Sequence, residues 1–221
     1  MDRNQKHLNY IDTVNLGSYY TPEIIVDLAY SILQRNVPNI EDFTILDSSC
    51  GYGSFLAKKN IAKRLIGADI DEKAISEAKK RIDDVDFLYQ NSLVSVFRKN
   101  LTIENNEKLI AIGNPPYNDT TSIIRNSIKD ASTQDKIDFD IKTRDLGMSF
   151  LLSYNKLQAD YVCVLHPLSY LIKKANFALL SKFAENYKLI DGIIISSHEF
   201  SDTSRGMAFP ILIALYKRDR D

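Results

Sequence analysis

Short apolar runs that alternate with amphipathic stretches limit the folds open to this chain more than any other feature. Five of these runs are predicted to be strands, at residues 43–47, 65–70, 86–90, 108–114 and 161–165. Helical stretches separate several of them, at residues 55–64, 71–82 and 146–158. Strands separated by helices imply right-handed βαβ units, because parallel neighbours need long crossover connections. The sequence therefore predicts an α/β fold with a mostly parallel sheet and helices on both faces.

Further elements flank this alternating block. Thr21 suits the N-cap of a helix and Pro22 suits its first position, and the apolar residues that follow share one face. This pattern predicts a helix over Thr21–Arg35. Three more elements follow the fifth strand, namely a helix at about residues 169–186 and strands at 189–196 and 207–216.

The length and composition suit a single domain over residues 1–221. Residues 1–20 form a polar N-terminal segment, and the polar stretch 118–145 is predicted to be a mobile functional loop, because loops this long are usually functional or disordered. Hydrophobic residues make up 44% of the chain and charged residues 26%, as in ordinary globular proteins. The apolar runs are far shorter than the ~20 residues of a membrane span, so no membrane partner is expected.

The charge balance and the cysteines exclude further classes. The chain has 28 Lys and Arg against 29 Asp and Glu, a net charge of −1. A self-sufficient DNA-binding protein usually carries a basic excess, so the whole chain is not a basic clamp. Cys50 and Cys163 form no CxxC motif and do not suggest a disulfide framework or a zinc site, and no metal is expected. This usage indicates a reducing, cytoplasmic compartment.

Polar residues stand at the predicted carboxyl ends of the strands, where open parallel sheets bind their ligands. Asp47 ends the first strand, and Gly51 and Gly53 permit a tight turn beside a ligand. Their spacing is not GxGxxG, which argues against an NAD-dependent dehydrogenase. Asp69, near the end of the second strand, suits both hydroxyls of a ribose, although a solvated charge is the alternative. Asp71 suits the N-cap of the next helix.

The stretch AIGNPPYN at residues 111–118 is the least ordinary of these strand ends. Two consecutive prolines cannot continue a helix and donate no hydrogen bonds to a sheet. Asn114 offers a carbonyl acceptor, and the rigid turn holds the Pro115 carbonyl nearby. Two adjacent acceptors match the two hydrogens of an exocyclic amino group, and Tyr117 offers an aromatic face to its ring. Asn91, after the third strand, suits either contact with a nucleobase or a turn.

NPPY at residues 114–117 resembles the amino-group methyltransferases that use S-adenosylmethionine (AdoMet). Together with YYTP at 19–22 and LDSSCGYGSFL at 46–56, it resembles the gamma-class DNA adenine-N6 methyltransferases of bacterial restriction–modification systems, over about residues 17–216. This resemblance implies a Rossmann-like methyltransferase fold with seven strands, the last of them antiparallel, and a bacterial or phage origin. NPPY alone is shared with RNA and protein-glutamine methyltransferases, so by itself it indicates only the reaction type.

The resemblance also implies which residues bind AdoMet. Tyr20, Thr21 and Pro22 close over its methionine part. The other residues that bind the cofactor are Asp47, Cys50, Gly51, Asp69, Ile70 and Asn91. Asp69 takes the ribose hydroxyls. Asn91 stands where the family usually has Asp, which accepts from the cofactor's adenine amino group, and the Asn carbonyl can also accept. The first loop reads DSSCG where DPxCG is commoner.

For the reaction, the resemblance implies a pocket around a flipped adenine. Asn114 and the carbonyl of Pro115 in the rigid Pro115–Pro116 turn accept the two N–H bonds of the target amine. This localises the nitrogen lone pair for attack on the cofactor's methyl group. Tyr117 stacks on one face of the base, and Phe200, in SSHEFSDTS, stacks on the other. His166 lies near the site in a structural role.

The partner implied is double-stranded DNA. In the gamma arrangement a target-recognition domain normally follows the catalytic domain, whereas this sequence stops at YKRDRD, directly after the last predicted strand. The chain is then either truncated or naturally short and dependent on a specificity partner. Two other functions stay open. One is an RNA or protein-glutamine methyltransferase with the same pocket, and the other is a non-catalytic AdoMet-binding subunit of a restriction assembly.

Overall fold

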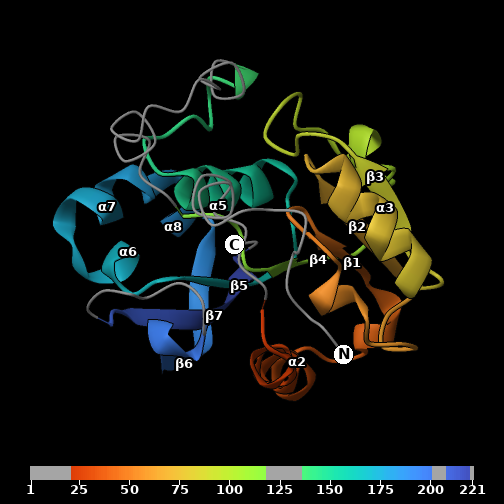
Figure 1. The fold of residues 1–221 in the computed structure, drawn as a ribbon. Helices are drawn as coiled ribbons and strands as arrows, with labels where there is room; N and C mark the ends of the chain where they lie inside the picture. Colours follow the sequence, from red (N-terminus) through yellow and green to blue (C-terminus); the bar gives the residue numbers. More distant parts are fainter. Residues whose placement is uncertain (1–20, 118–135, 201–207, 220–221) are drawn as a thin grey trace.

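The computed structural model describes residues 21–117, 136–200 and 208–219. Its sheet has seven strands in the order β3-β2-β1-β4-β5-β7-β6 (Figure 1). Their bounds are β1 Thr44–Asp47, β2 Arg64–Asp69, β3 Asp86–Tyr89, β4 Leu109–Gly113, β5 Tyr161–Pro167, β6 Tyr187–Ser196 and β7 Pro210–Arg218. Strands β1 to β5 pair in parallel, and β7 is antiparallel to its neighbours β5 and β6. The predicted mostly parallel sheet with an antiparallel last strand is confirmed.

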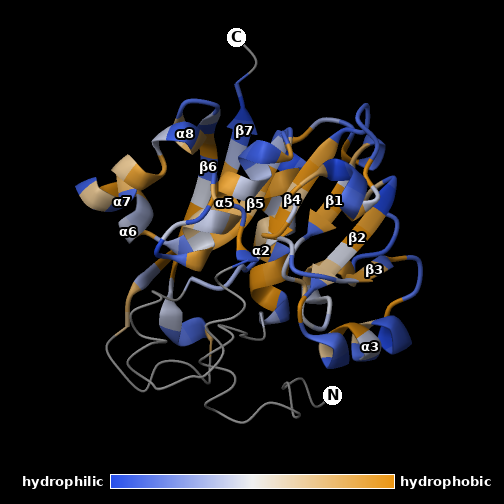
Figure 2. Ribbon diagram, turned by 90° about the horizontal axis from the view of Figure 1, so that it is seen from above, coloured by the Kyte–Doolittle hydropathy of each residue, from blue (hydrophilic) through white to orange (hydrophobic). Residues whose placement is uncertain are grey.

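Helices cover both faces of this sheet (Figure 1). On one face, α2 (Glu23–Asn36) and α3 (Glu72–Arg81) share an apolar cluster with alternate residues of β1, β4 and β7. On the other face, α5 (Leu146–Lys156) and α8 (Ser181–Ala184) share a second cluster with the intervening residues. Because both faces are covered, the central strands are continuous apolar runs, and Figure 2 shows them in the hydrophobic colour.

The first helix begins two residues later than predicted. Helix α2 spans Glu23–Asn36 rather than Thr21–Arg35, and Pro22 occupies its N-cap position without a side-chain hydrogen bond. Pro22 has ψ 147°, an extended conformation, so the helical backbone starts only after it. The prediction that Thr21 caps this helix is therefore wrong.

Two other predicted helices are shorter or broken. In place of the helix predicted at residues 55–64, the structure has only a short 3-10 helix at Ser54–Leu56. Asn60 has φ 56°, a left-handed conformation through which a right-handed helix cannot continue. The predicted helix at residues 169–186 is divided into α6 (Ser169–Ile172), α7 (Lys174–Leu179) and α8 (Ser181–Ala184). Lys173 is extended between α6 and α7, which breaks the helix there.

Part of the predicted loop 118–145 packs onto the sheet. Ile137 and Ile141 are 7% and 3% exposed and belong to the same cluster as α5. Residues 118–135 of this loop, and the N-terminal segment 1–20, lie outside the described residues. None of the helices that the structure describes has the length and apolar character to cross a membrane.

Candidate active site

The carboxyl ends of β1 and β4 meet at the centre of one edge of the sheet. The chain runs outward from β1 to β2 and β3 and then returns to β4 on the other side of β1, so the strand order reverses between β1 and β4. Open α/β sheets bind ligands outside such a switch point. Asp47 is the last residue of β1, and Asn114 follows β4 directly. The fold therefore brings two of the predicted strand-end motifs together.

Asp47 is buried against the backbone that carries Asn114. It is 2% exposed, and its Oδ1 accepts a hydrogen bond from the Ser49 N–H at 3.2 Å. Gly113 has φ 146°, and a Cβ at this position would lie 2.6 Å from Asp47 Oδ1. Glycine is required here, because a side chain would collide with the carboxylate. Burial, together with the charge of Asp69, raises the pKa of Asp47 to about 8.

Asp69, at the end of β2, joins two strand-end loops. Its Oδ2 accepts from the Gly51 N–H at 2.7 Å, and its Oδ1 accepts from the Asp71 N–H at 2.9 Å. Burial raises the pKa of Asp69 in spite of these backbone hydrogen bonds. Each carboxylate oxygen keeps a second lone pair, so the side chain can still accept from a ribose. Asp71 caps α3 as predicted, by accepting the N–H groups of Lys73 and Ala74.

Three further predicted cofactor residues follow β1, β2 and β3. Cys50 is buried, and burial raises the pKa of its thiol, so it is a neutral side chain rather than a thiolate nucleophile. Ile70 is 43% exposed, directly after Asp69. Asn91 Oδ1 accepts the Leu93 N–H at 3.0 Å, so this amide closes a turn and keeps one lone pair for another donor. The described residues include no group of three or more His, Cys, Asp or Glu that could hold a metal ion.

Asn114 presents a buried acceptor without a partner. Its Nδ2 donates to Thr21 Oγ1 at 3.4 Å, whereas its Oδ1 has no hydrogen-bond partner in the part of the chain that the structure describes. Leaving a buried acceptor unpaired costs about 1–3 kcal/mol. Such an atom in a folded protein calls for an explanation, and a ligand that supplies the missing donor is one.

Two other buried side-chain atoms share this property and lie at the same edge. They are Ser49 Oγ, in the loop after β1, and Ser92 Oγ, in the loop after β3. Within residues 21–117, 136–200 and 208–219, these two atoms and Asn114 Oδ1 are all the buried side-chain N and O atoms without a partner. The sequence does not indicate that either serine belongs to a binding site, because serine is common in loops.

The residues around Thr21 and the two prolines are placed as follows. Thr21 is 4% exposed and turns its hydroxyl towards Asn114. Pro22 leads into α2, and Pro115 is buried within the turn. Pro116 is partly buried. Tyr20, the remaining predicted residue of the YYTP motif, lies outside the described residues.

Tyr117 and Phe200 are the predicted stacking residues. Tyr117 is half-buried and packs against both apolar clusters, with its Cβ 3.0 Å from the position that a Cβ on Gly147 would take. Phe200 is 3% exposed and belongs to the cluster beneath α2, so its ring has no open face in this structure. The stacking role of Phe200 stays a prediction, and residues 201–207, which follow it, lie outside the described residues.

A buried network lies behind Tyr117. Tyr170 Oη donates to Asp145 Oδ1, which also accepts the Gly147 N–H at 2.9 Å and so caps α5. The ring of Tyr170 stacks on His166 at 5.1 Å between centroids, and His166 Nε2 pairs with Tyr216 Oη at 2.7 Å. Burial lowers the pKa of His166 to about 4, which keeps it neutral and agrees with a structural role. An Asp directly before an apolar helix is a sequence signal for an N-cap, so the role of Asp145 could have been predicted. The sequence contains no signal for the contact that Tyr170 makes with it.

The chain matches a known protein family by sequence and several solved structures by fold. The profile of the family described as N-6 DNA methylase matches residues 9–184. No curated protein matches the chain. Among solved structures, a candidate RNA methyltransferase from Pyrococcus horikoshii aligns with a TM-score of 0.63 and 14% identity, over 94% of this chain and 88% of its own.

Two other solved structures give a similar match. A candidate class I S-adenosylmethionine-dependent methyltransferase from Listeria monocytogenes aligns with a TM-score of 0.65 and 18% identity, over 91% of this chain and 61% of its own. The methyltransferase subunit of a type I restriction–modification system from Streptococcus thermophilus aligns with a TM-score of 0.62 and 18% identity, over 91% of this chain and 45% of its own. At these identities the likeness shows the fold, and the predicted methyltransferase fold is confirmed.

Proposed function

The chain belongs to the N-6 DNA methylase family, and on this premise we propose that it transfers a methyl group from S-adenosylmethionine to the N6 amino group of adenine in DNA. One observation supports this function most directly, the buried and unpaired Oδ1 of Asn114 at the end of β4. A fixed acceptor is complementary to an N–H donor, and an exocyclic amino group supplies that donor.

S-adenosylmethionine is the cofactor of this family, and the residues present fit it. The unpaired hydroxyls of Ser49 and Ser92 lie in the loops on either side of β2 and can bind its polar groups. Asp69 has lone pairs for the ribose hydroxyls, and the exposed Ile70 offers an apolar surface to the adenine ring. When bound, the cofactor would supply an electrophilic methyl group on a sulfonium centre, with the thioether as the leaving group, and the methylated nitrogen would lose one N–H proton to solvent.

The chain's own residues prepare the target amine. The amino nitrogen of adenine is a poor nucleophile, because its lone pair is delocalised into the ring. Asn114 Oδ1 and the Pro115 carbonyl accept its two N–H bonds and draw the nitrogen towards tetrahedral geometry, which localises the lone pair. The Pro115–Pro116 turn orients both acceptors before the target arrives, so little reorganisation is left for the transition state. Tyr117 stacks on the ring of the base.

The target base enters this pocket by extrusion from the duplex, and a target-recognition domain or specificity subunit selects the site. The net charge of −1 means that the chain has no overall basic excess for phosphate contacts. The chain also spans less than half the length of the type I methyltransferase subunit that it resembles. We expect weak and non-specific duplex binding by this chain alone. Tight sequence-specific binding in a gel-shift assay would contradict that expectation.

Transfer of a radiolabelled methyl group to unmethylated plasmid DNA, followed by nucleoside analysis, tests the proposed function. We expect the label in N6-methyladenine. Label in a methylated cytosine would contradict the choice of base, and an unlabelled plasmid together with a labelled RNA or protein would contradict the choice of substrate.

Methylation of RNA by the same pocket is the second candidate. It is favoured by the match to the candidate RNA methyltransferase, which extends over 88% of that protein's chain. Ribosomal RNA and protein extract in the same assay compare RNA and glutamine acceptors with DNA. Tight AdoMet binding without turnover on any acceptor, even beside a specificity subunit, would instead favour a non-catalytic subunit.

A further inference from the structure

Thr21 makes a contact that neither its place in the sequence nor its predicted roles explain. Its Oγ1 accepts a hydrogen bond from Asn114 Nδ2, 93 residues along the chain, at 3.4 Å. The side chain is 4% exposed, and the N-cap of α2 is Pro22 rather than Thr21. The hydroxyl is therefore buried beside the proposed acceptor of the target amine.

Helix α2 holds Thr21 in place. The carbonyl of Pro22 accepts the backbone N–H groups of Ile25 and Val26 at 3.0 and 3.2 Å. Ile25 and Val26 are 1% and 3% exposed, in the cluster that packs α2 on the sheet. Since Thr21 directly precedes this anchored turn, its hydroxyl is a fixed partner for a side chain on the neighbouring loop.

The two ends of the Asn114 carboxamide have opposite hydrogen-bonding character. Oδ1 only accepts and Nδ2 only donates, and the terminal torsion of an asparagine has a broad, roughly two-fold profile. With Nδ2 bonded to Thr21, Oδ1 is the end left buried and unpaired. Only that end can accept an N–H bond from an amine.

We propose that Thr21 is a positioning residue whose hydroxyl holds the Asn114 carboxamide with Oδ1 directed at the target amine. The identity of that amine rests on the proposed function, whereas the hydrogen bond does not. This role differs from contact with the methionine part of AdoMet, which the resemblance implies for Thr21. Positioning of Asn114 affects kcat, whereas a cofactor contact affects the dissociation constant of AdoMet.

Three single variants separate these roles. Thr21→Val keeps the shape of the side chain but removes the hydroxyl, so Asn114 is free to rotate. Thr21→Ser keeps the hydroxyl. Thr44→Val is the matched control, because Thr44 is also buried, at 1% exposed, and its Oγ1 bonds to Glu107 at the opposite edge of the sheet.

We expect Thr21→Val to lower kcat for methyl transfer roughly tenfold, with the AdoMet dissociation constant changed by less than about twofold. Thr21→Ser should restore most of kcat, and Thr44→Val should lower the melting temperature without a change in kcat. An unchanged kcat in Thr21→Val, or a loss confined to AdoMet affinity, would overturn the positioning role.

A second measurement does not depend on methyl transfer. In 15N-labelled protein, the side-chain amide signals of Asn114 can be assigned by their loss in Asn114→Ala. We expect Thr21→Val to shift and broaden these signals, and Thr21→Ser and Thr44→Val to leave them close to the wild-type positions. Unchanged signals in Thr21→Val would overturn the inference. If the wild-type protein methylates no DNA, the proposed function fails, and these signals still decide whether Thr21 holds the carboxamide.

Discussion

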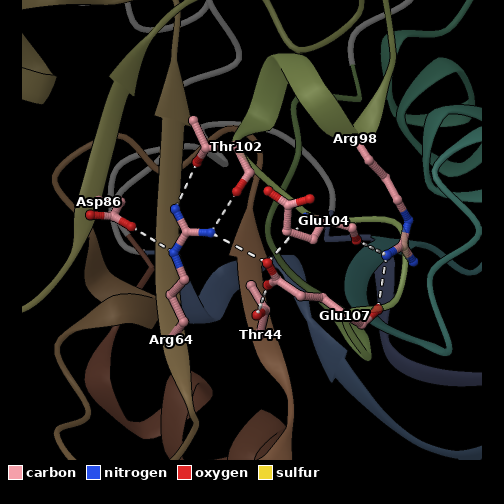
Figure 3. Close-up of polar contacts among 7 residues, drawn as sticks. All are labelled: Thr44, Arg64, Asp86, Arg98, Thr102, Glu104 and Glu107. Atoms are coloured by element: carbon pink, nitrogen blue, oxygen red, sulfur yellow. Dashed lines mark hydrogen bonds and ion pairs between the residues drawn. The ribbon is translucent and has the colours of Figure 1, made fainter.

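Polar side chains are paired differently at the two edges of the sheet. We call these the amino edge, where the parallel strands begin, and the carboxyl edge, where they end. At the amino edge, Arg64 at the start of β2 donates to Asp86 Oδ2 at 2.7 Å and to Thr102 Oγ1 at 2.8 Å (Figure 3). Glu107 accepts from Thr44 Oγ1 at 2.5 Å, so it also has a protein partner. At the carboxyl edge, Asn114 Oδ1 and two serine hydroxyls are buried without partners in the described parts of the chain.

The pKa shifts of the carboxyl groups have opposite directions at the two edges. Burial raises the pKa of Asp47 and that of Asp69 at the carboxyl edge. Burial alone would also raise the pKa of Glu107 at the amino edge, but the hydrogen bonds from Thr44 and Glu104 and the charge of Arg64 lower it. An edge that satisfies its own polar groups stabilises the fold, whereas an edge that leaves them unpaired is suited to a ligand.

The largest effect on this contrast should come from Asn114→Ala. Without the acceptor, we expect kcat to fall by at least a factor of about 10²–10³, since removal of one oriented catalytic dipole elsewhere has effects of this size. AdoMet affinity should stay nearly intact. The melting temperature should change little, because the variant removes an unpaired buried acceptor but also loses the hydrogen bond from Nδ2 to Thr21. Radiolabel transfer and calorimetry measure the two quantities. Equal loss of both would contradict the role of Asn114.

Asp69→Asn should act on the cofactor instead. Each carboxylate oxygen of Asp69 accepts one backbone N–H, from Gly51 or from Asp71. An asparagine has only one acceptor oxygen, so one of these hydrogen bonds is lost together with the negative charge. We expect AdoMet affinity to fall roughly tenfold to a hundredfold, as for hydrogen bonds to charged groups. Asp86→Asn is the matched control, because Asp86 pairs with Arg64 at the amino edge. If both variants bind AdoMet equally well, the assignment of Asp69 is wrong.

Arg98→Ala should affect stability without an effect on the chemistry. The Arg98 guanidinium donates to the backbone carbonyls of Glu104 and Glu107 (Figure 3) and also to those of Leu157 and Gln158, at 2.8–3.2 Å. We expect the free energy of unfolding to fall by about 2 kcal/mol, because several carbonyls lose a charged donor. Arg98→Lys should recover only part of the lost free energy of unfolding, since an ammonium group lacks the several coplanar N–H donors of a guanidinium. Urea unfolding measures the loss. A lower kcat in fully folded Arg98→Ala would show that contacts at the amino edge affect catalysis at the carboxyl edge.

Asp47→Asn should change the pH dependence of stability. The pKa of Asp47 in the folded protein is about 8, above its ordinary value of 3.8. Between these values the folded state holds a proton that the unfolded state releases, so stability falls as the pH rises through this range. Asparagine does not titrate, so the variant should show a flatter profile in urea unfolding without AdoMet. Parallel profiles for the two proteins would contradict the burial of this carboxyl group.

Sequence reasoning succeeds where structure follows from local patterns. The seven strands and the cap at Asp71 come from apolar runs and from a residue type that suits a helix start, and both are present. It fails at residues 55–64 and 169–186, where helical patterns are interrupted. Asn60 adopts a left-handed conformation, which asparagine tolerates better than most residue types but does not require, and Lys173 adopts an extended one that its residue type does not indicate. A short helical pattern does not by itself secure a helix, because isolated short helices are marginal in water.

The sequence alone determines that the chain makes a parallel sheet with polar strand ends and a rigid turn after Asn114, because apolar periodicity and the fixed φ of proline act within a few residues. Only the tertiary structure decides that Thr21 bonds Asn114 rather than capping its own helix, and that the ring of Phe200 is buried. It also decides that the pKa of Asp47 is raised. These properties depend on burial and on contacts between residues far apart in the chain, which exist only once the helices have packed on the sheet.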